Sequence, residues 1–221
     1  MRIILIGGTG LIGGLAVPLL EERHEVLVVG RRASGAKRER LGEIAAWPGL
    51  IASETVDVFV STLGTTIAQA GSWEAFAGVD RDAVVASARA ARAAGARVAI
   101  MVSSVGADAG ARGRYLRIKG EAERAVAELG FERVEVIRPG LLLGQRTGPP
   151  RRLEAAAIAV GPWLAPLLRG RLSRYAPIEA AVVARAIVAL VSAEGAGVRV
   201  HENKAIRALA CQRHPDSNGE A

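Results

Sequence analysis

The stretch from residue 3 to residue 13 reads Ile-Ile-Leu-Ile-Gly-Gly-Thr-Gly-Leu-Ile-Gly and decides the fold. Its first four residues form a short apolar run, which is typical of a strand buried on both faces. The glycines follow this run and open an apolar pattern over residues 11–23 that is typical of a helix. A strand, a glycine-rich turn and a helix in this order are the context that a dinucleotide-binding turn requires.

Each glycine of the turn has a distinct physical task. Gly7 permits the tight turn, Gly10 lets the backbone approach a pyrophosphate, and Gly13 allows the helix to pack closely on the strand. The free N–H groups and the dipole at the start of the helix then favour the phosphates. A second register stays open, because the motif G-x-G-x-x-G also fits when it begins at Gly8. We assign these residues of the turn to cofactor binding: Gly7, Thr9, Gly10, Leu11, Ile12 and Gly13.

Short apolar runs alternate with helical stretches along most of the chain. The runs predict strands at residues 3–6, 26–29, 56–61, 98–102 and 134–137. The helical stretches lie at residues 11–23, 73–94 and 117–129. This alternation predicts an α/β fold with a doubly wound parallel sheet. Residues 33–54 are short and charged for a further crossover, and we place one more strand there, near residues 41–47.

The pattern changes after Pro139 and Gly140. A loop and an apolar region lead to a helix at residues 178–192, a strand at 198–200 and a short helix at 203–209. This part is too small for a separate domain. We therefore predict a single domain over residues 1–211, in which residues 141–211 form a small substrate-side cap at the carboxyl ends of the strands, and a disordered tail at 212–221.

Tyr115 and Lys119 form the chemical centre of the sequence. Positions i and i+4 of a helix share one face, so the phenol and the ammonium point into the same space. The ammonium favours the phenolate electrostatically, which makes the tyrosine a usable proton donor or acceptor. Ser104 lies upstream and offers a hydroxyl that can hold a carbonyl or alcohol oxygen. Alone, the Tyr–Lys pair is common on solvated helix faces; after a dinucleotide-binding turn, the three residues become a catalytic hypothesis.

Two arginines at the end of the second predicted strand indicate which nucleotide binds. Asp or Glu at this place would bond the ribose 2′-hydroxyl of NAD, but the chain has Arg31 and Arg32. Two guanidiniums can pair with a 2′-phosphate, so we predict NADP(H); the alternative is that they are surface arginines. Leu63, Gly64 and Thr65 follow the third clear strand and form a further backbone-rich turn that we assign to the cofactor.

Composition excludes several classes of function. The 221 residues carry a net charge of +7, but the arginines are scattered and not interleaved with aromatic side chains, so no specific nucleic-acid partner is expected. One cysteine excludes an intrachain disulfide, and the three histidines lack metal-ligand spacing, so no metal site is predicted. No apolar run has membrane-spanning length. We expect a cytoplasmic protein with a small-molecule substrate and a possible homodimer.

With these residues in place, the chain resembles the short-chain dehydrogenase/reductase superfamily. Within it, the chain is most similar to atypical NADP-binding members related to the Tat-interactive protein 2 oxidoreductase. The resemblance covers nearly the whole chain to about residue 209. It rests on segments that begin at Ser61 (Ser-Thr-Leu-Gly-Thr-Thr), Ala70 (Ala-Gly-Ser), Met101 (Met-Val-Ser-Ser-Val-Gly-Ala), Tyr115 (Tyr-Leu-Arg-Ile-Lys-Gly-Glu), Leu129 (Leu-Gly-Phe-Glu-Arg), Arg138 (Arg-Pro-Gly-Leu-Leu-Leu-Gly) and Glu202 (Glu-Asn-Lys-Ala-Ile).

The resemblance implies a Rossmann fold, bound NADP(H) and roles for particular residues. Tyr115 would donate or accept the proton, and Lys119 would tune it and hold the nicotinamide ribose. Ser104 would orient the substrate oxygen, with Ser103 as the alternative. Two further residues, Pro139 and Gly140, would pass beside the nicotinamide. The chain departs from many relatives in its shortened segment after the second strand and in its loop at residues 107–114, where adenine and substrate contacts are therefore in doubt.

These features predict an NADP(H)-dependent oxidoreductase that transfers a hydride between the nicotinamide and a carbonyl or alcohol carbon. Arg138, Arg146 and the apolar segment 153–168 are candidates for contact with a partly apolar substrate, although this segment can equally serve to cover the core. Two alternatives stay open. One is an NADPH-binding sensor or scaffold with little turnover. The other is a sugar-nucleotide epimerase or dehydratase, which the small C-terminal part disfavours.

Overall fold

A seven-stranded parallel sheet forms the centre of the molecule. The computed structural model describes residues 1–144 and 170–212. The sheet has the order β3-β2-β1-β4-β5-β6-β9, and every pair of neighbours is parallel. The strands are β1 (Arg2–Ile6), β2 (Glu25–Gly30), β3 (Glu39–Leu41), β4 (Val58–Ser61), β5 (Val98–Val102), β6 (Arg133–Arg138) and β9 (Gly197–Glu202). The predicted doubly wound α/β fold is confirmed.

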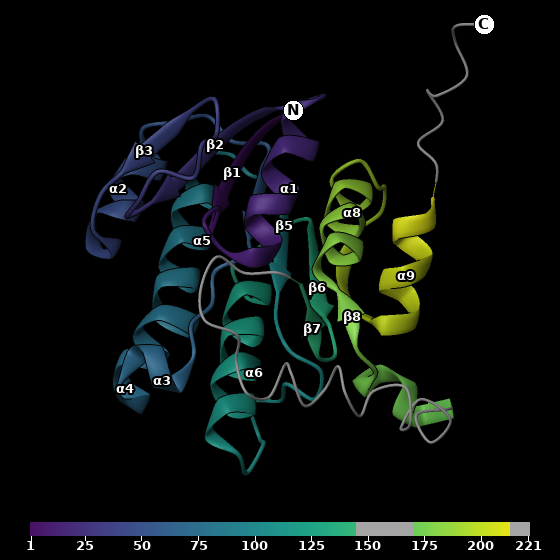
Figure 1. Ribbon diagram of the computed structural model, residues 1–221. Helices are drawn as coiled ribbons and strands as arrows, with labels where there is room; N and C mark the ends of the chain where they lie inside the picture. The colour runs from purple at the N-terminus through teal and green to yellow at the C-terminus, as the bar shows by residue number, and fades with distance from the viewer. Residues whose placement is uncertain (145–169, 213–221) are drawn as a thin grey trace, which may run out of the picture.

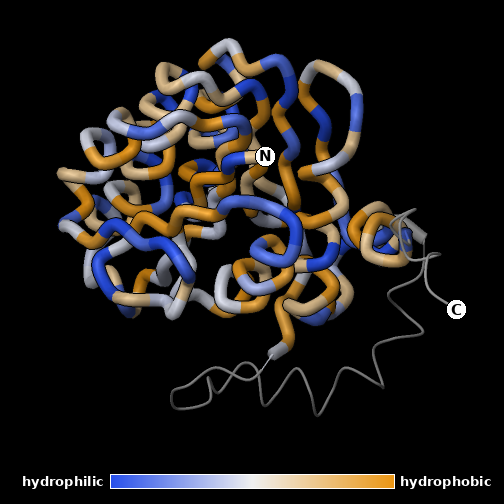
Figure 2. Tube along the Cα trace, turned by 90° about the horizontal axis from the view of Figure 1, so that it is seen from above, coloured by the Kyte–Doolittle hydropathy of each residue, from blue (hydrophilic) through white to orange (hydrophobic). Residues whose placement is uncertain are grey.

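Helices cover both faces of this sheet (Figure 1). One apolar layer lies between the sheet and the helices α1 (Leu11–Glu21), α8 (Ala180–Val191) and α9 (Asn203–Cys211). The opposite layer joins the sheet to α2 (Trp47–Ala52), α5 (Val84–Ala93) and α6 (Arg114–Ala127). Figure 2 shows hydrophobic segments running through the middle of the molecule, with hydrophilic ones in the surrounding connections. The central strands read as continuous apolar runs because both of their faces are buried in this way.

The predicted strand near residues 41–47 is only partly correct. Strand β3 is present beside β2, but it ends at Leu41. A short turn of helix, η1 (Ile44–Ala46), and then α2 take up the rest of the stretch. Pro48 stands in the first turn of α2, where a missing N–H costs nothing, and the indole of Trp47 donates to the carbonyl of Gly42 at 2.9 Å.

The helix predicted at residues 73–94 has three parts. It begins as α4 (Trp73–Ala77), widens into a π-helical segment η2 (Gly78–Ala83), and continues as α5. A short helix α3 (Ile67–Ala70) precedes it, and the Thr66 side chain caps α3 by accepting from the Gln69 N–H. Widened π turns of this kind occur frequently at functional sites.

The C-terminal part contributes directly to the main sheet. Strand β9 pairs with β6 in register from Arg133↔Gly197 to Arg138↔Glu202, and α8 packs beside α1. A two-stranded parallel ladder, β7 (Leu142–Leu143) and β8 (Ile178–Glu179), and a 3-10 segment, η3 (Gly170–Tyr175), complete the described elements. The single domain over 1–211, its cap over 141–211 and the tail at 212–221 stay predictions, and residues 145–169 and 213–221 lie outside the described residues. Within residues 1–144 and 170–212, no helix is long and apolar enough to cross a membrane.

Candidate functional site

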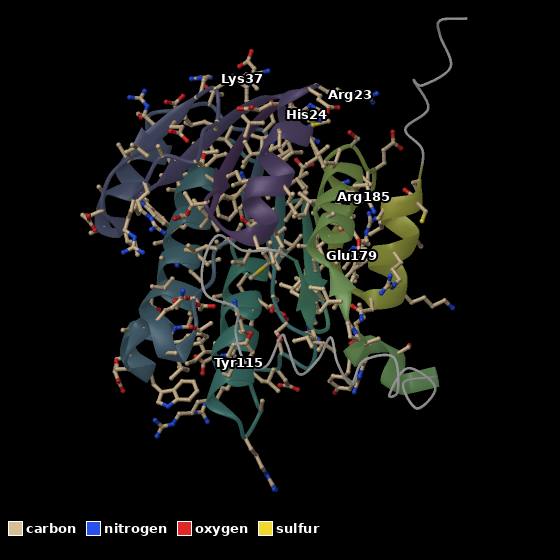
Figure 3. The ribbon with its side chains drawn as sticks, in the orientation of Figure 1. Arg23, His24, Lys37, Tyr115, Glu179 and Arg185 are labelled. Atoms are coloured by element: carbon tan, nitrogen blue, oxygen red, sulfur yellow. The ribbon has the colours of Figure 1, made fainter. Side chains whose placement is uncertain are left out.

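The predicted site residues gather at one edge of the sheet, where the parallel strands have their carboxyl ends. Figure 3 shows Tyr115 at this edge, far from His24 and Arg23, which lie at the amino ends of the strands. The chain leaves β1 through the glycine-rich turn and leaves the adjacent strand β4 through the segment that contains Gly64. Open α/β sheets bind their ligands where two such neighbouring connections part.

The glycine-rich turn is packed so closely that side chains are excluded at two positions. A Cβ on Gly7, which has φ +88°, would lie 2.5 Å from the backbone nitrogen of Leu63. A Cβ on Gly13 would lie 2.2 Å from the carbonyl oxygen of Gly7 and 2.6 Å from the hydroxyl of Thr62. That hydroxyl donates to the carbonyl oxygens of Ile6 and Gly7, at 3.1 Å each. The two connections after β1 and β4 are thus locked together through Thr62.

The start of α1 is suited to an anion. Gly10 is the N-cap residue, no side chain caps the helix, and no acidic residue lies in its first turn. The first N–H groups of this helix, from Leu11 and Ile12 onward, therefore have no side-chain acceptor. Backbone N–H groups at a helix start bind phosphate, and Gly7, Gly10 and Gly13 keep the turn before this helix start free of side chains.

Strand β5 delivers the two candidate serines to the same edge. Ser103 is 7% exposed, its N–H donates to the carbonyl of Ile137 at 2.7 Å, and its buried hydroxyl has no hydrogen-bond partner among the described residues. Ser104 is half-buried, and its carbonyl begins a turn by accepting from the N–H of Ala107. The structure thus brings both serines to the site, and the choice between them stays a prediction.

Tyr115 lies in the first turn of α6, which begins at Arg114 rather than at the predicted residue 117. The residue is 39% exposed, and its hydroxyl makes no hydrogen bond to any residue that the structure describes. The ring packs against Phe76, with centroids 5.5 Å apart, and the Phe76 ring in turn stands nearly perpendicular to the Trp73 ring, at 5.9 Å. An aromatic wall therefore stands beside a solvent-facing phenol.

The position of α6 is set by a close contact with the loop before it. A Cβ on Gly120 would lie 2.2 Å from the backbone carbon of Asp108, so the helix approaches the loop at a distance that only glycine allows. The N–H of Asp108 donates to the carbonyl of Leu116 at 3.2 Å, and its carboxylate accepts from the N–H of Gly110 at 2.7 Å. The loop at 107–114, which departs from the pattern of many relatives, thus has a structural role in fixing α6.

Lys119 has a partner that the sequence did not suggest. Its ammonium lies 2.6 Å from a carboxylate oxygen of Asp80, and the two side chains are 8% and 0% exposed. The other oxygen of Asp80 accepts from the backbone N–H of Thr65 at 2.8 Å. A Cβ on Gly64 would lie 3.6 Å from the lysine nitrogen, so the predicted turn after β4 does adjoin Lys119. Asp80 is one functional candidate that sequence reasoning missed.

Arg31 and Arg32 follow β2 and are exposed. Neither guanidinium forms an ion pair or hydrogen bond with any residue in 1–144 or 170–212. The next residues form a loop around Glu39, whose carboxylate accepts from the hydroxyl and the N–H of Ser34, at 2.6 Å each. The hydrogen bond from the Ser34 hydroxyl lowers the pKa of Glu39. Ser34 lies beside Gly8, so this loop borders the glycine-rich turn.

Gly140 is held in place by a buried amide, and the carbonyl of the preceding Pro139 accepts from the N–H of Val105 at 3.1 Å. The side-chain oxygen of Asn203 accepts from the N–H of Gly140 at 2.9 Å, and its nitrogen donates to the carbonyls of Ala176 at 2.7 Å and Ser173 at 3.3 Å. A Cβ on Gly140 would lie 2.4 Å from the carbonyl oxygen of Ala176. Asn203 is 3% exposed and is the second residue missed by sequence reasoning, although its Glu-Asn-Lys segment was part of the family resemblance.

The predicted substrate contacts are only partly described. Arg138 is paired within the protein, because its guanidinium donates two hydrogen bonds to the carboxylate of Glu123 on α6. The bond from its Nε is 3.0 Å long. These hydrogen bonds to Glu123 raise the pKa of Arg138. Arg146 and the apolar segment 153–168 lie outside the described residues. No group of three or more side chains able to hold a metal occurs within 1–144 and 170–212.

Solved structures with the same arrangement support the fold. The chain aligns with MoeE5 in complex with UDP-glucose and NAD at a TM-score of 0.67 and 17% identity, over 91% of this chain and 76% of that one. It aligns with UDP-glucose 4-epimerase from Thermotoga maritima, solved with UDP-glucose, at a TM-score of 0.68 and 15% identity, over 91% and 77% of the two chains. The predicted Rossmann fold is thereby confirmed.

Curated relatives give the family, while no protein-family model matches the sequence. The chain is 34% identical over 201 residues to the mitochondrial protein FMP52 of Candida albicans. The alignment covers 85% of this chain and 86% of that one. It is 34% identical over 226 residues to the FMP52 protein of Eremothecium gossypii, which covers 97% and 99%. These relatives are named as mitochondrial proteins, so the predicted cytoplasmic location is wrong. The narrower resemblance to the Tat-interactive protein 2 oxidoreductase stays a prediction. Identity at this level over nearly the full length of both chains shows that the protein belongs to the FMP52 family.

Proposed function

We propose that this chain is an NADP(H)-dependent oxidoreductase that moves a hydride between the nicotinamide and a carbonyl or alcohol carbon of a small, partly apolar substrate. One observation carries the proposal: the glycine-rich turn, the serines after β5 and the Tyr115–Lys119 pair on α6 converge at the same edge of the sheet. Separate parts of the sequence supply these three features, and their convergence supports a common function.

The residues at this edge fit a nicotinamide dinucleotide. The cradle of Gly7, Gly10 and Gly13 and the uncapped start of α1 would hold the pyrophosphate. The guanidiniums of Arg31 and Arg32, which have no protein partner among the described residues, would hold a 2′-phosphate and so select NADP(H) over NAD(H). The solved neighbours named above were determined with NAD or with a UDP-sugar, which is consistent with a nucleotide at this edge.

When bound, the nicotinamide supplies or accepts the hydride. The Tyr115 hydroxyl would give a proton to the substrate oxygen or take one from it, because this phenol faces solvent and has no competing hydrogen bond among the described residues. Ser104, or Ser103 in its place, would hold the same oxygen. Lys119 would hold the ribose hydroxyls and favour the phenolate. The aromatic wall of Trp73 and Phe76 favours a substrate with an apolar part next to its reacting group.

The test is an NADPH-oxidation screen over aldehydes, ketones and quinones, with Tyr115→Phe measured in parallel. The wild-type protein is expected to oxidise NADPH with at least one substrate. The variant should lose turnover by about 100-fold to 10,000-fold, the usual contribution of a positioned proton donor, while it binds NADPH normally. Turnover that survives in Tyr115→Phe would contradict the catalytic assignment. A uniformly negative screen with normal NADPH binding would favour the sensor or scaffold alternative.

A further inference from the structure

Asp80 lies at a position of the helix face that is otherwise occupied by small and apolar residues. Buried residues recur along α4, η2 and α5 at helical spacing: Phe76, Ala77, Asp80, Ala83, Val84, Ser87, Ala88 and Ala91. A carboxylate at such a position loses its hydration, which is costly unless the charge is paired and hydrogen-bonded. A structural helix face needs no acid there, so the burial of Asp80 requires a separate reason.

Asp80 joins three parts of the chain that converge on the candidate site. Its carboxylate meets the ammonium of Lys119 on α6 and the backbone N–H of Thr65 after β4, and it is itself carried by η2. A Cβ on Gly64 would lie 3.4 Å from the carboxylate, so the turn passes directly over the ion pair. One side chain therefore sets the distance between the predicted nicotinamide-ribose lysine and the predicted cofactor turn.

A second ion pair links the same two elements, η2 and α6. It allows a purely structural role for the Asp80 pair to be distinguished from a role in the site. Arg81 on η2 pairs with Glu121 on α6 at 2.7 Å. The side chains of Arg81 and Glu121 are 36% and 27% exposed, so this pair lies outside the buried junction. If η2 and α6 only needed to be joined, this pair would suffice. A buried pair is also poor evidence of stability for its own sake, because desolvation offsets much of the attraction. The difference between the two pairs points to a role for Asp80 in the site.

We propose that Asp80 is a positioning residue for Lys119, which acts by holding the lysine ammonium against the Gly64–Thr65 turn in the place where it meets the cofactor. The proposal rests on the proposed function for what Lys119 binds. It adds that the lysine is not free on its helix face: its direction is set from η2, through a carboxylate that is anchored by a backbone N–H. The π turn is the local distortion that carries this carboxylate.

The test is a double-mutant cycle read by NADPH affinity, measured by fluorescence titration of the purified protein. Asp80→Asn keeps an oxygen that can accept from Thr65 but removes the charge that holds the ammonium, and Lys119→Met removes the ammonium. Each single variant is expected to bind NADPH about tenfold more weakly than the wild type. The double variant should bind no more weakly than Lys119→Met alone, because residues that act through one contact are not additive. Glu121→Gln, which breaks the second ion pair between the same elements, should bind normally.

The titration separates this inference from the proposed function. If the wild-type protein does not bind NADPH, the proposed function fails, and the inference fails with it. If the wild type binds and Asp80→Asn binds equally well, or if Glu121→Gln weakens binding as much, the inference alone fails. Additive losses in the double variant would also overturn it. Asp80→Asn leaves the buried Lys119 ammonium without its carboxylate and can reduce the amount of folded protein. In that case the double variant is compared with Lys119→Met alone. Equal NADPH affinity supports the inference, and a further loss of affinity overturns it.

Discussion

The two ends of the parallel sheet differ in how completely their polar groups are paired within the protein. At the amino ends, charged residues pair with one another from strand to strand: Arg2 with Asp57 at 3.1 Å, Arg38 with Glu25 at 3.8 Å, and Arg97 with Glu132 at 2.6 Å. A surface pocket of about 210 Å³ also lies at the amino ends. Its lining includes both partners of such a pair, Arg38 and Glu25.

At the carboxyl ends, several polar groups lack protein partners among the described residues. Examples are the hydroxyls of Ser103 and Tyr115 and the guanidiniums of Arg31 and Arg32. Other groups at this end are paired: Asp80 with Lys119, Arg138 with Glu123, and Arg174 with Glu202. Buried polar groups in folded proteins are normally satisfied, so an orphan such as the Ser103 hydroxyl calls for an explanation. A ligand that supplies the missing partners at the carboxyl ends provides one.

The largest effect expected at the carboxyl ends comes from the glycine-rich turn. Gly13→Ala places a Cβ 2.2 Å from the carbonyl oxygen of Gly7, so the turn must shift. We expect a loss of roughly 1–3 kcal/mol in the free energy of unfolding and a fall of at least about tenfold in NADPH affinity, by thermal unfolding and titration.

The adjacent residue provides the matched control for this substitution. Gly14 is exposed, and a Cβ there would have only the Gly8 carbonyl oxygen nearby, at an ordinary 3.6 Å. Gly14→Ala should therefore stabilise α1 by up to about 1 kcal/mol and leave NADPH affinity unchanged. Equal effects of the two substitutions would show that the close packing of the turn is not what binds the cofactor.

The sequence predicted much of this turn and of the sheet because their rules are local. Continuous apolar runs mark strands buried on both faces, and glycines between a strand and a helix mark a backbone that must approach closely. The boundaries of β3 were less predictable, since the strand ends at Leu41 and helical turns, η1 and then α2, take up the residues that follow.

Asp80 shows what could not be predicted. In the sequence it stands in Val-Asp-Arg-Asp, which is typical of a solvated charge cluster. Its periodic spacing with Phe76 and Val84 placed it on the buried face, but the partner that makes burial possible is Lys119, on a helix far along the chain. Asn203 was hidden for the same reason, because its three hydrogen-bond partners come from two distant segments.

A smaller, selective effect is expected from the arginines after β2. Replacing both Arg31 and Arg32 with Ala should weaken NADPH binding by about tenfold to 100-fold, because charge-assisted contacts to a 2′-phosphate would be lost, and leave NADH binding unchanged. Arg97→Ala at the amino ends, where the partner is Glu132, is the control and should change neither affinity. If the double variant still prefers NADPH as strongly as the wild type, the role given to these arginines is wrong.

The smallest effect is expected at the amino ends. The hydrogen bonds from the side chain and N–H of Arg2 lower the pKa of Asp57 below its ordinary value of 3.8. A lowered carboxyl pKa stabilises the folded state above that value, and the contribution is lost as pH falls through the folded pKa. Asp57→Asn should thus cost about 0.5 kcal/mol or less at neutral pH, because the pair is 47% and 40% exposed.

Two further measurements on Asp57→Asn, its thermal midpoint at low pH and its NADPH affinity, check this prediction. The difference in thermal midpoint between Asp57→Asn and the wild type should narrow as pH falls below 3.8, where the wild type loses its own contribution. NADPH affinity at neutral pH should not change. A weakened NADPH affinity in this variant would break the division between the two ends of the sheet.

The central claim, hydride transfer at the carboxyl ends of the strands, is tested most directly by an isotope. NADPH that carries deuterium at the transferred C4 position is incubated with the protein and a substrate identified by the oxidation screen, and the product is analysed by mass spectrometry. We predict one deuterium on the former carbonyl carbon with the wild-type protein and none above background with Tyr115→Phe. A product that forms without deuterium, although NADPH is bound at the glycine-rich turn, would contradict the account.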